Sequence, residues 1–179
     1  ECLLPLSSEA ALVQALETFG AAFEPAVVRG TLARLGLADA DGKALEEIVR
    51  PFYSALAASR IPFEQAFFDL IGGAEPERLE RSPNRIIYAA EPFATLCARM
   101  RGWPRAPGLP EALARPYFSD PAPATMLIGE VEGLWAPIAE RDDWQAFSDK
   151  IGGVRRMGEA YALLLPARTS QPGHVRMGA

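Results

Sequence analysis

The sequence predicts an all-α fold: an irregular bundle of about seven or eight helices that ends in a helical hairpin. Three observations carry this prediction. Apolar residues recur at spacings of three and four along most of the chain. Proline and glycine stand at positions where helices commonly begin and end. No segment shows convincing period-two alternation of apolar and polar residues, which a half-buried strand requires.

The first two expected helices are separated by a glycine. Ser7 and Ser8 are suited to cap the first helix, and Gly20 is placed to end it. The second helix is expected over residues 24–35, because its apolar positions lie three and four apart and a glycine follows directly. Pro25 would then stand in its first turn, where its missing N–H costs nothing.

The next two helices are each marked by a proline. Apolar residues keep the helical period over 45–56, and Pro51 should kink this helix or split it at Arg50. Pro62 suits the first position of a fourth helix, rich in phenylalanine. The glycine pair at 72–73 is expected to stop that helix.

A fifth helix, with Pro92 in its first turn, leads into a stretch of different composition. Residues 103–123 contain six prolines, too many for one continuous helix, although "PEALAR" could form a single turn. Large aromatic side chains are not expected to be fully exposed to water, and this stretch contains Trp103, Tyr117 and Phe118. We therefore expect 103–123 to be an ordered loop that wraps around the bundle.

The end of the pattern predicts a hairpin. Helices are expected over 126–138 and 144–161, joined by a short polar turn in which Asp142 or Asp143 caps the second helix. The glycine pair at 152–153 either weakens that helix by about 1 kcal/mol per residue or marks a close crossing. Residues 1–165 are thus expected to form one helical unit, followed by an extended tail over 166–179.

Charge and composition argue against several classes of partner. The net charge is −5 and the sequence pI is about 5.0, which argues against nucleic acid and against a polybasic membrane contact. No stretch approaches the ~20 uninterrupted apolar residues of a membrane helix. The start at Glu1 is not that of a signal peptide, so we expect a fragment or processed product. Cys2 and Cys97 are expected as reduced thiols in a cytoplasmic protein.

No group of residues predicts a catalytic, cofactor or metal site. His174 is the only histidine and is the sixth residue counted from the end, far from any nucleophile or ligand pattern. "DADG" at 39–42 has its glycine too early for a calcium loop. Asp142 and Asp143 could act as an acid/base or metal-binding pair, but their place before a helix favours capping.

Other charged and aromatic clusters have simple structural interpretations beside functional ones. Glu46 and Arg50 stand four apart on a helix, as an exposed ion pair would. Two basic clusters could bind phosphate or an acidic partner, although helix ends also favour cations: Arg99, Arg101 and Arg105, and Arg155 with Arg156. Four aromatic residues could line a pocket or simply fill the core: Tyr53, Phe63, Phe67 and Phe68.

Several stretches together resemble the C-terminal helical part of the selenoprotein O family, the pseudokinase-fold protein adenylyltransferases. They are "ECLLPL", "ALVQALETFGAAFEPAVVRGTLARLGL", "IPFEQAFFDLIGG", "FATLCARMRGW" and "PATMLIGEVEGLWAPIAERDDWQAF", and the resemblance covers about residues 1–165. Leu96 and Met100 stand where the family has Trp and Tyr, and Ile128 and Gly129 replace the Arg-Asn of its N-P-x-x-x-L-R-N pattern.

The resemblance implies a parent protein that transfers AMP from ATP, with Mg²⁺, to hydroxyl side chains of protein substrates. The family's phosphate-binding and metal-binding residues belong to an N-terminal kinase-like core, and none of their motifs occurs here. The tail "GHVRMGA" also lacks the family's redox-active cysteine or selenocysteine. The resemblance therefore assigns no catalytic, cofactor or metal residue to this chain.

Two functions are consistent with the sequence. The first is a non-catalytic subdomain that supports the kinase-like core, with the hairpin over 126–161 docking through Trp135 and Trp144. Such a subdomain should expose a broad apolar face along 1–35 or 103–123. The second is a free-standing all-α module that binds a peptide or partner helix in one apolar groove. A helical domain that binds a small ligand would need a closed pocket with convergent polar groups.

Overall fold

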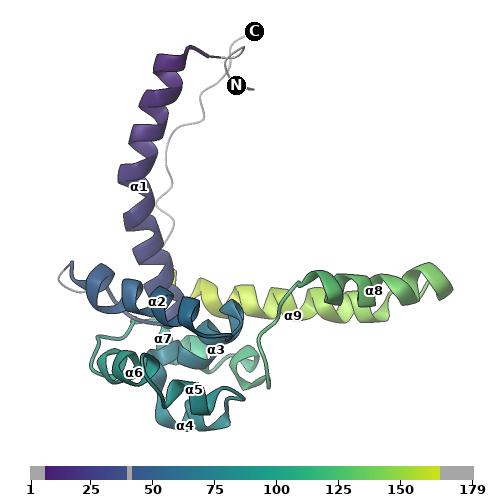
Figure 1. Cartoon of the computed structure of the whole chain (residues 1–179). Coiled ribbons are helices and arrows are strands. Elements are labelled where there is room, and N and C mark those ends of the chain that lie inside the picture. Colours follow the sequence, from purple (N-terminus) through teal and green to yellow (C-terminus); the bar gives the residue numbers. More distant parts are fainter. Residues whose placement is uncertain (1–6, 40–41, 166–179) are drawn as a thin grey trace.

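The computed structural model describes residues 7–39 and 42–165, and within them the chain is all-α as predicted (Figure 1). Its only β feature in this part of the chain is an isolated bridge between Leu37 and Arg105. The elements are α1 (Glu9–Leu35), the π-helical turn η1 (Leu45–Val49), α2 (Arg50–Ala58), α3 (Phe63–Ala74), α4 (Pro76–Arg81), α5 (Arg85–Tyr88), α6 (Phe93–Arg101), α7 (Leu109–Leu113), the 3₁₀ turn η2 (Pro116–Ser119), α8 (Ile128–Arg141) and α9 (Gln145–Ala162).

Residues 31–118, here called the body, hold almost all of the buried side chains. One cluster joins the end of α1 to η1, α2, α3, α5 and α6, and its largest members include Phe52, Phe67 and Phe93. A second cluster lies between α3, α7, η2 and the end of α9, and centres on Tyr117 and Phe118. Helix α3 contributes to both clusters, so it is the central element of the body.

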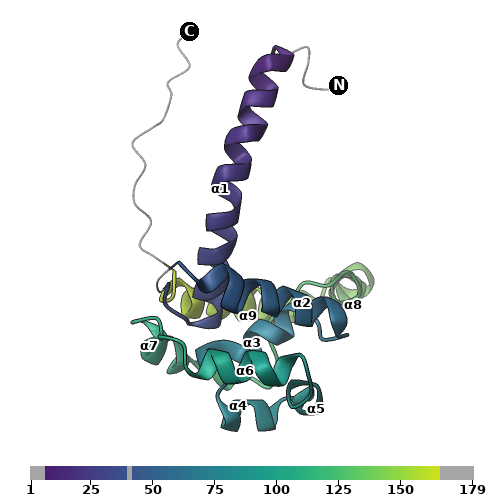
Figure 2. The same cartoon turned by 60° about the vertical axis from the view of Figure 1, so that its left-hand side comes forward.

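Two parts of the chain leave the body. Residues 9–28 of α1, here called the α1 arm, extend away from the body in one direction (Figures 1 and 2). Helices α8 and α9, here called the hairpin arm, extend in another. Between residues 119 and 159 no described residue is buried, and none is buried in the α1 arm.

The prediction of two helices separated at Gly20 is wrong, because α1 runs without a break from Glu9 to Leu35. Ser8 caps it as expected, accepting the N–H of Ala11 at 3.3 Å. Gly36, not Gly20, takes the left-handed conformation that ends a helix, with φ of 67°. Pro25 therefore lies inside the helix, where it removes only one backbone hydrogen bond.

The prolines and glycines of the body act largely as predicted. Pro51 lies in the first turn of α2 but does not split the helix at Arg50, because Val49 and Arg50 keep helical dihedral angles and only the hydrogen-bond pattern changes from π to α there. The N–H of Arg50 donates to the carbonyl of Leu45, five residues back. Gly72 and Gly73 end the helical part of α3 with φ of 79° and 86°. Pro62 is the residue before α3 and not its first position.

The segment between α3 and α8 is more helical than the sequence suggested. Helices α4 and α5 and the turn η2 were not predicted, because each is four to six residues long and too short to show a periodic pattern. The expected single turn in "PEALAR" is α7. Tyr117 and Phe118 are buried as predicted, and the Trp103 indole N–H donates to the carbonyl of Ala38 at 2.9 Å.

The predicted hairpin is present over α8 and α9. Asp142 takes a left-handed conformation at the end of α8, and the Asp143 carboxylate accepts the N–H of Gln145 at 3.0 Å. The polar turn is present as predicted, but the N-cap residue of α9 is Trp144, and Asp143 only accepts the first N–H of that helix from one position earlier. Gly152 and Gly153 mark no close crossing, because a Cβ at either position would meet only the side chain of Arg156.

Candidate docking surfaces

One buried carboxylate, that of Asp69, links several elements of the body through hydrogen bonds. Asp69 of α3 is 4% exposed and accepts hydrogen bonds from Ser82 Oγ at 2.6 Å, Tyr88 Oη at 2.9 Å and Gln65 Nε2 at 2.8 Å. These donors come from α3, from the residue after α4 and from α5. Burial and the neighbouring Asp69 charge raise the pKa of Tyr88, so its hydroxyl stays a donor. The cluster ties three elements together.

Arg78 of α4 is held by two backbone carbonyls and by two aromatic rings. Its Nε donates to the carbonyl of Phe68 at 2.8 Å and its Nη1 to that of Phe118 at 3.2 Å. The guanidinium lies over the Phe68 ring, with its carbon 4.5 Å from the ring centroid. Burial lowers the pKa of Arg78, and the Asp69 charge opposes that shift. Arg78 thus connects α4 to both α3 and η2.

An open cavity of about 490 Å³ lies between these groups and the surface. Its wall holds Asp69, Arg78 and Arg81 beside Glu75, Glu77 and Asp120, so both signs of charge are present. Asp69 spends its oxygens on the fold, and Arg78 uses its Nε and Nη1 there, but the buried Nη2 of Arg78 has no hydrogen-bond partner in the described part of the chain. The described residues contain no group of three histidine, cysteine or acidic side chains placed to hold a metal ion. The cavity wall therefore includes a residue with an unpaired buried donor, Arg78 Nη2, beside side chains of both charges.

In the basic cluster, Arg105 binds backbone carbonyls at the C-terminal end of α6. Arg105 donates to the carbonyls of Met100 at 2.9 Å and Arg101 at 3.1 Å, and pairs with Glu75 at 3.1 Å. A Cβ on Gly73 would lie 2.5 Å from the Arg105 guanidinium, so the glycine makes room for it. These contacts support the structural interpretation, in which Arg105 caps the C-terminal end of α6.

The other candidates from the sequence are placed in structural roles. Glu46 and Arg50 pair at 3.1 Å on the surface. Phe67 and Phe68 are buried, whereas Phe63 remains 46% exposed beside Tyr53. Burial raises the pKa of the Cys97 thiol to about 11, so the thiolate that reacts with oxidants is scarce. His174 and Cys2 lie outside the described residues.

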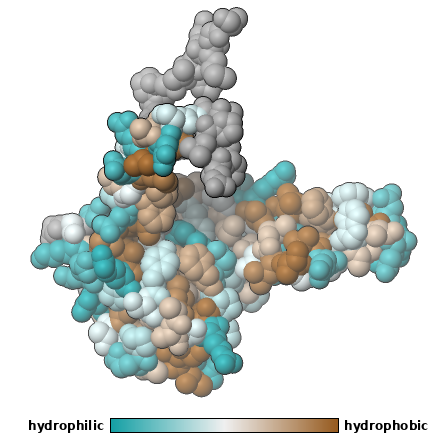
Figure 3. Space-filling view, turned by 45° about the horizontal axis from the view of Figure 1, so that its top comes forward, coloured by the Kyte–Doolittle hydropathy of each residue, from teal (hydrophilic) through white to brown (hydrophobic). Residues whose placement is uncertain are grey.

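The hairpin arm presents large apolar side chains to solvent. Ile128, Val131 and Trp135 stand at i, i+3 and i+7 on the outer side of α8 and are 76%, 39% and 61% exposed. Trp144 is 49% exposed, and its indole N–H donates to Asp142 Oδ1 at 2.8 Å. Figure 3 shows the resulting apolar surface along this arm.

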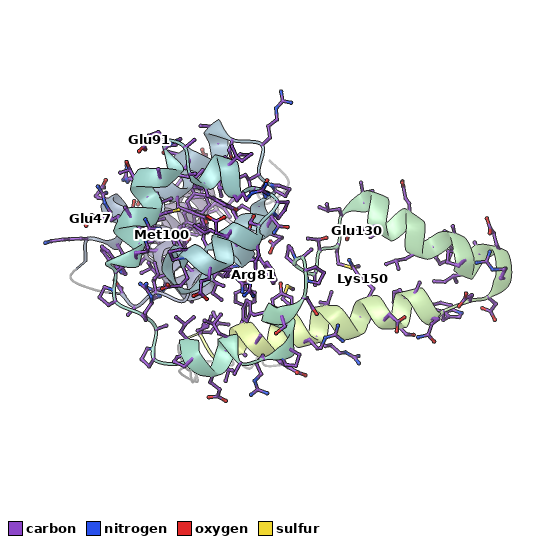
Figure 4. All side chains as sticks on the ribbon, turned by 90° about the horizontal axis from the view of Figure 1, so that it is seen from below. Glu47, Arg81, Glu91, Met100, Glu130 and Lys150 are labelled. Atoms are coloured by element: carbon purple, nitrogen blue, oxygen red, sulfur yellow. The ribbon has the colours of Figure 1, made fainter. Side chains whose placement is uncertain are left out.

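An ion pair joins the two helices of the hairpin arm. Lys150 Nζ of α9 lies 2.9 Å from Glu130 Oε2 of α8, and Figure 4 shows the two side chains facing each other between the helices. Glu130 also accepts the N–H of Leu127 at 3.2 Å and the hydroxyl of Thr125. These hydrogen bonds, with the Thr125 contribution largest, lower the pKa of Glu130. Its carboxylate therefore both caps α8 and bridges to α9.

The α1 arm presents a second apolar surface. Leu16, Phe19 and Phe23 share one face of the helix and are 71%, 60% and 53% exposed. The Phe19 and Phe23 rings lie against each other, with centroids 5.2 Å apart. By length and composition α1 is also long and apolar enough to cross a membrane, and unlike a core helix its apolar window is not buried.

The docking surfaces and the buried polar cluster differ in how visible they were in the sequence. The apolar stripes of α1 and α8 are readable as periodic patterns, but the pattern does not show that they lack a cover. Asp69 and Arg78 were missed as organising residues. A carboxylate inside the otherwise apolar run "AFFDLIGG" was the available signal, because a buried acid must find hydrogen-bond donors.

Comparisons with protein families, with curated proteins and with solved structures found no match to this chain.

Proposed function

We propose that the chain is a non-catalytic docking subdomain whose two arms pack against a larger protein. The observation that carries this proposal is the hairpin arm. It places Trp135 and Trp144 in solvent, and no described residue from 119 to 159 is buried. A two-helix hairpin has little stability in water without a surface to pack on. A protein partner that covers α8 would supply that surface.

The proposed partner is the kinase-like core of a selenoprotein-O-like AMP-transferase, which uses ATP and Mg²⁺ to modify hydroxyl side chains of other proteins. The support for this partner is the sequence resemblance over about residues 1–165. In the described residues, the conspicuous polar groups of the body serve the fold: Asp69 binds three donors and Arg105 caps a helix. On this proposal the chain buttresses the core and contributes to the surface that meets protein substrates.

The test has two parts. The reading frame upstream of Glu1 is determined, and a kinase-like core found there is expressed separately and mixed with residues 1–179. We expect a 1:1 complex by light scattering, and AMP transfer from radiolabelled ATP only when the core is present. Trp135→Ala should weaken the complex by about tenfold or more, since exposed tryptophans commonly dominate interfaces. AMP transfer by residues 1–179 alone would overturn the proposal.

A free-standing interaction module is the second candidate, and the body favours it. Residues 31–118, together with the end of α9, enclose two buried clusters and a polar network, as an independent domain does. If this candidate is right, no kinase-like core precedes the chain and the isolated protein remains monodisperse. A cut-off subdomain should instead bind an apolar dye and aggregate as its concentration rises.

A further inference from the structure

The hairpin arm is held to the body chiefly through the C-terminal end of α9. Ala160 and the following Leu164 are buried in the second cluster of the body. A Cβ on Gly108 would lie 2.2 Å from the carbonyl oxygen of Leu163, so the backbone just before α7 lies directly against the residue after α9. Most of α9 projects away from the body (Figure 1). The direction of the arm is therefore set at one short contact.

Tyr161 connects this contact to the base of α1. Its ring packs against the body, with its centroid 6.0 Å from that of Tyr117 and 5.4 Å from that of Phe118. The guanidinium carbon of Arg34, in the last turn of α1, lies 5.7 Å from the Tyr161 centroid. A guanidinium at this distance from an aromatic ring is attracted to it. Arg34 and Tyr161 thus bring the bases of the two arms together.

Arg34 is itself held by α3. Its guanidinium carbon lies 3.9 Å from the ring centroid of Phe67 and 5.4 Å from that of Phe63. It also forms an ion pair with Glu64 of the same helix. The Arg34 side chain is 28% exposed, so these contacts are screened less than those of a fully solvated pair. A rotation of α9 would therefore have to break contacts of Arg34 with α3 or with Tyr161.

We propose that Arg34 and Tyr161 form a joint that fixes the angle between the α1 arm and the hairpin arm. The two arms then meet a partner in one set geometry, which reduces the entropy lost on docking and makes the second contact intramolecular. The role in docking rests on the proposed function. The joint itself belongs to the isolated chain and is measured without a partner.

The length of α9 makes the joint sensitive to small changes. Gln145 lies sixteen residues, or about 24 Å, from Tyr161 along the helix, so a rotation of about 10° at Tyr161 would move the start of α9 by about 4 Å. A displacement of this size is large enough to observe directly as a change in the distance between the arms.

The test measures that distance in residues 1–179 by double electron–electron resonance between spin labels at Gln14→Cys and Ala139→Cys. Both positions are exposed, the first in the α1 arm and the second near the end of α8. Cys2→Ser removes a competing thiol, and Cys97 is buried. With the joint intact we expect one narrow distance distribution.

Two variants open the joint from opposite sides. Arg34→Met keeps the length of the side chain and removes its charge, and Tyr161→Leu removes the ring but keeps an apolar contact with the body. Each should shift or broaden the distance distribution by about 4 Å, as the length of the arm predicts. The two changes combined should have no larger effect than the stronger one alone, because both remove the same contact.

The matched control is Arg99→Met. Arg99 is an exposed arginine of α6 that donates to the carbonyl of Glu47 at 3.3 Å, within the body. Its replacement should leave the distance between the arms unchanged. An equal broadening in this control would overturn the inference, because the distance would then report general loosening of the body.

The unfolding midpoint separates a joint from a merely stabilising contact. If Arg34 and Tyr161 only add stability, the midpoint falls while the distances in the folded protein stay the same, and the inference is wrong. If the variants broaden the distribution but bind the kinase-like core as tightly as the unchanged chain does, the set geometry has no role in docking and that part of the inference is overturned. If the unchanged chain binds no such core while the Arg34 variant broadens the distribution, the proposed function fails and the joint is supported.

Discussion

The body and the two arms are built from the same kind of sequence but differ in what covers them. In both, apolar residues recur at helical spacing. Phe52 and Phe67 of the body are 0% and 1% exposed, with ring centroids 4.8 Å apart. Phe19 and Phe23 of the α1 arm are paired almost as closely, yet both are more than half exposed. Periodicity thus shows which face of a helix is apolar and not whether the same chain covers it.

The largest expected effect tests this difference in burial. Phe52→Ala should lower the free energy of unfolding by about 3–5 kcal/mol, because it removes a fully buried ring and leaves a cavity. Trp135→Ala, at a side chain 61% exposed, should change it by less than about 0.5 kcal/mol. Denaturant unfolding of the isolated chain measures both. A comparable loss in the two variants would show that the hairpin arm belongs to the body's cooperative unit.

Buried and exposed carboxylates provide the second contrast. Asp69→Ala leaves Ser82 and Tyr88 without their acceptor inside the body, which should cost about 2–3 kcal/mol of stability. Glu132→Ala in α8 removes an exposed carboxylate and should fall within about 0.5 kcal/mol of the unchanged protein. Denaturant unfolding of the two variants measures both changes in stability. An Asp69 variant as stable as the parent would mean that its donors find other partners.

Gly20 inside α1 and Gly36 directly after it give the third contrast, with effects of opposite sign. Gly36→Ala should destabilise the body by about 1–3 kcal/mol, since φ is 67° there and a Cβ would lie 2.5 Å from Leu109 Cδ1. Gly20→Ala meets open space inside the helix and should stabilise the α1 arm by about 1 kcal/mol. Helicity by circular dichroism and thermal unfolding measure the two effects. A helix that ended at Gly20 would lose stability on the same change.

The sequence predicted the elements that rest on local chemistry. Gly72 and Gly73 end the helical part of α3, Pro51 stands where the π-helical turn passes into α2, and Asp143 accepts the first N–H of α9, because each acts through its own backbone or nearest neighbours. The local sequence did not distinguish Gly20, which lies inside α1, from Gly36, which ends the helix. Gly36 is fixed in its conformation by the bridge between Leu37 and Arg105 and by contact with Leu109, all of which depend on chain far away in sequence.

The candidate site was predictable only in part for the same reason. The hairpin and its tryptophans follow from periodicity, but their exposure depends on how α8 and α9 leave the body. The role of Asp69 depends on Ser82, which follows α4, and on Tyr88 of α5, up to 19 residues away, and these two short helices have no periodic pattern. Long-range hydrogen bonds of this kind become visible only when the tertiary structure is known.

The smallest expected effect concerns Glu130, which joins the two helices of the hairpin arm. Its hydrogen bonds with Thr125 and Lys150 lower its pKa in the folded arm, so its contribution is present above the ordinary carboxyl range and is lost as pH falls through the lowered pKa. Glu130→Gln should therefore weaken the hairpin by about 0.2–1 kcal/mol at neutral pH and remove that pH dependence.

Hydrogen exchange of α8 amides at neutral and acidic pH measures this loss, and Glu140→Gln is the control, because Glu140 pairs only with its exposed neighbour Arg141 among the described residues. Faster exchange in the Glu130 variant at neutral pH, with little difference at low pH, would show that the ion pair stabilises the arm before any partner binds. Equal exchange at both pH values would mean that the hairpin owes its geometry to apolar contacts between α8 and α9, and that a docking partner would meet an arm shaped without this charge pair.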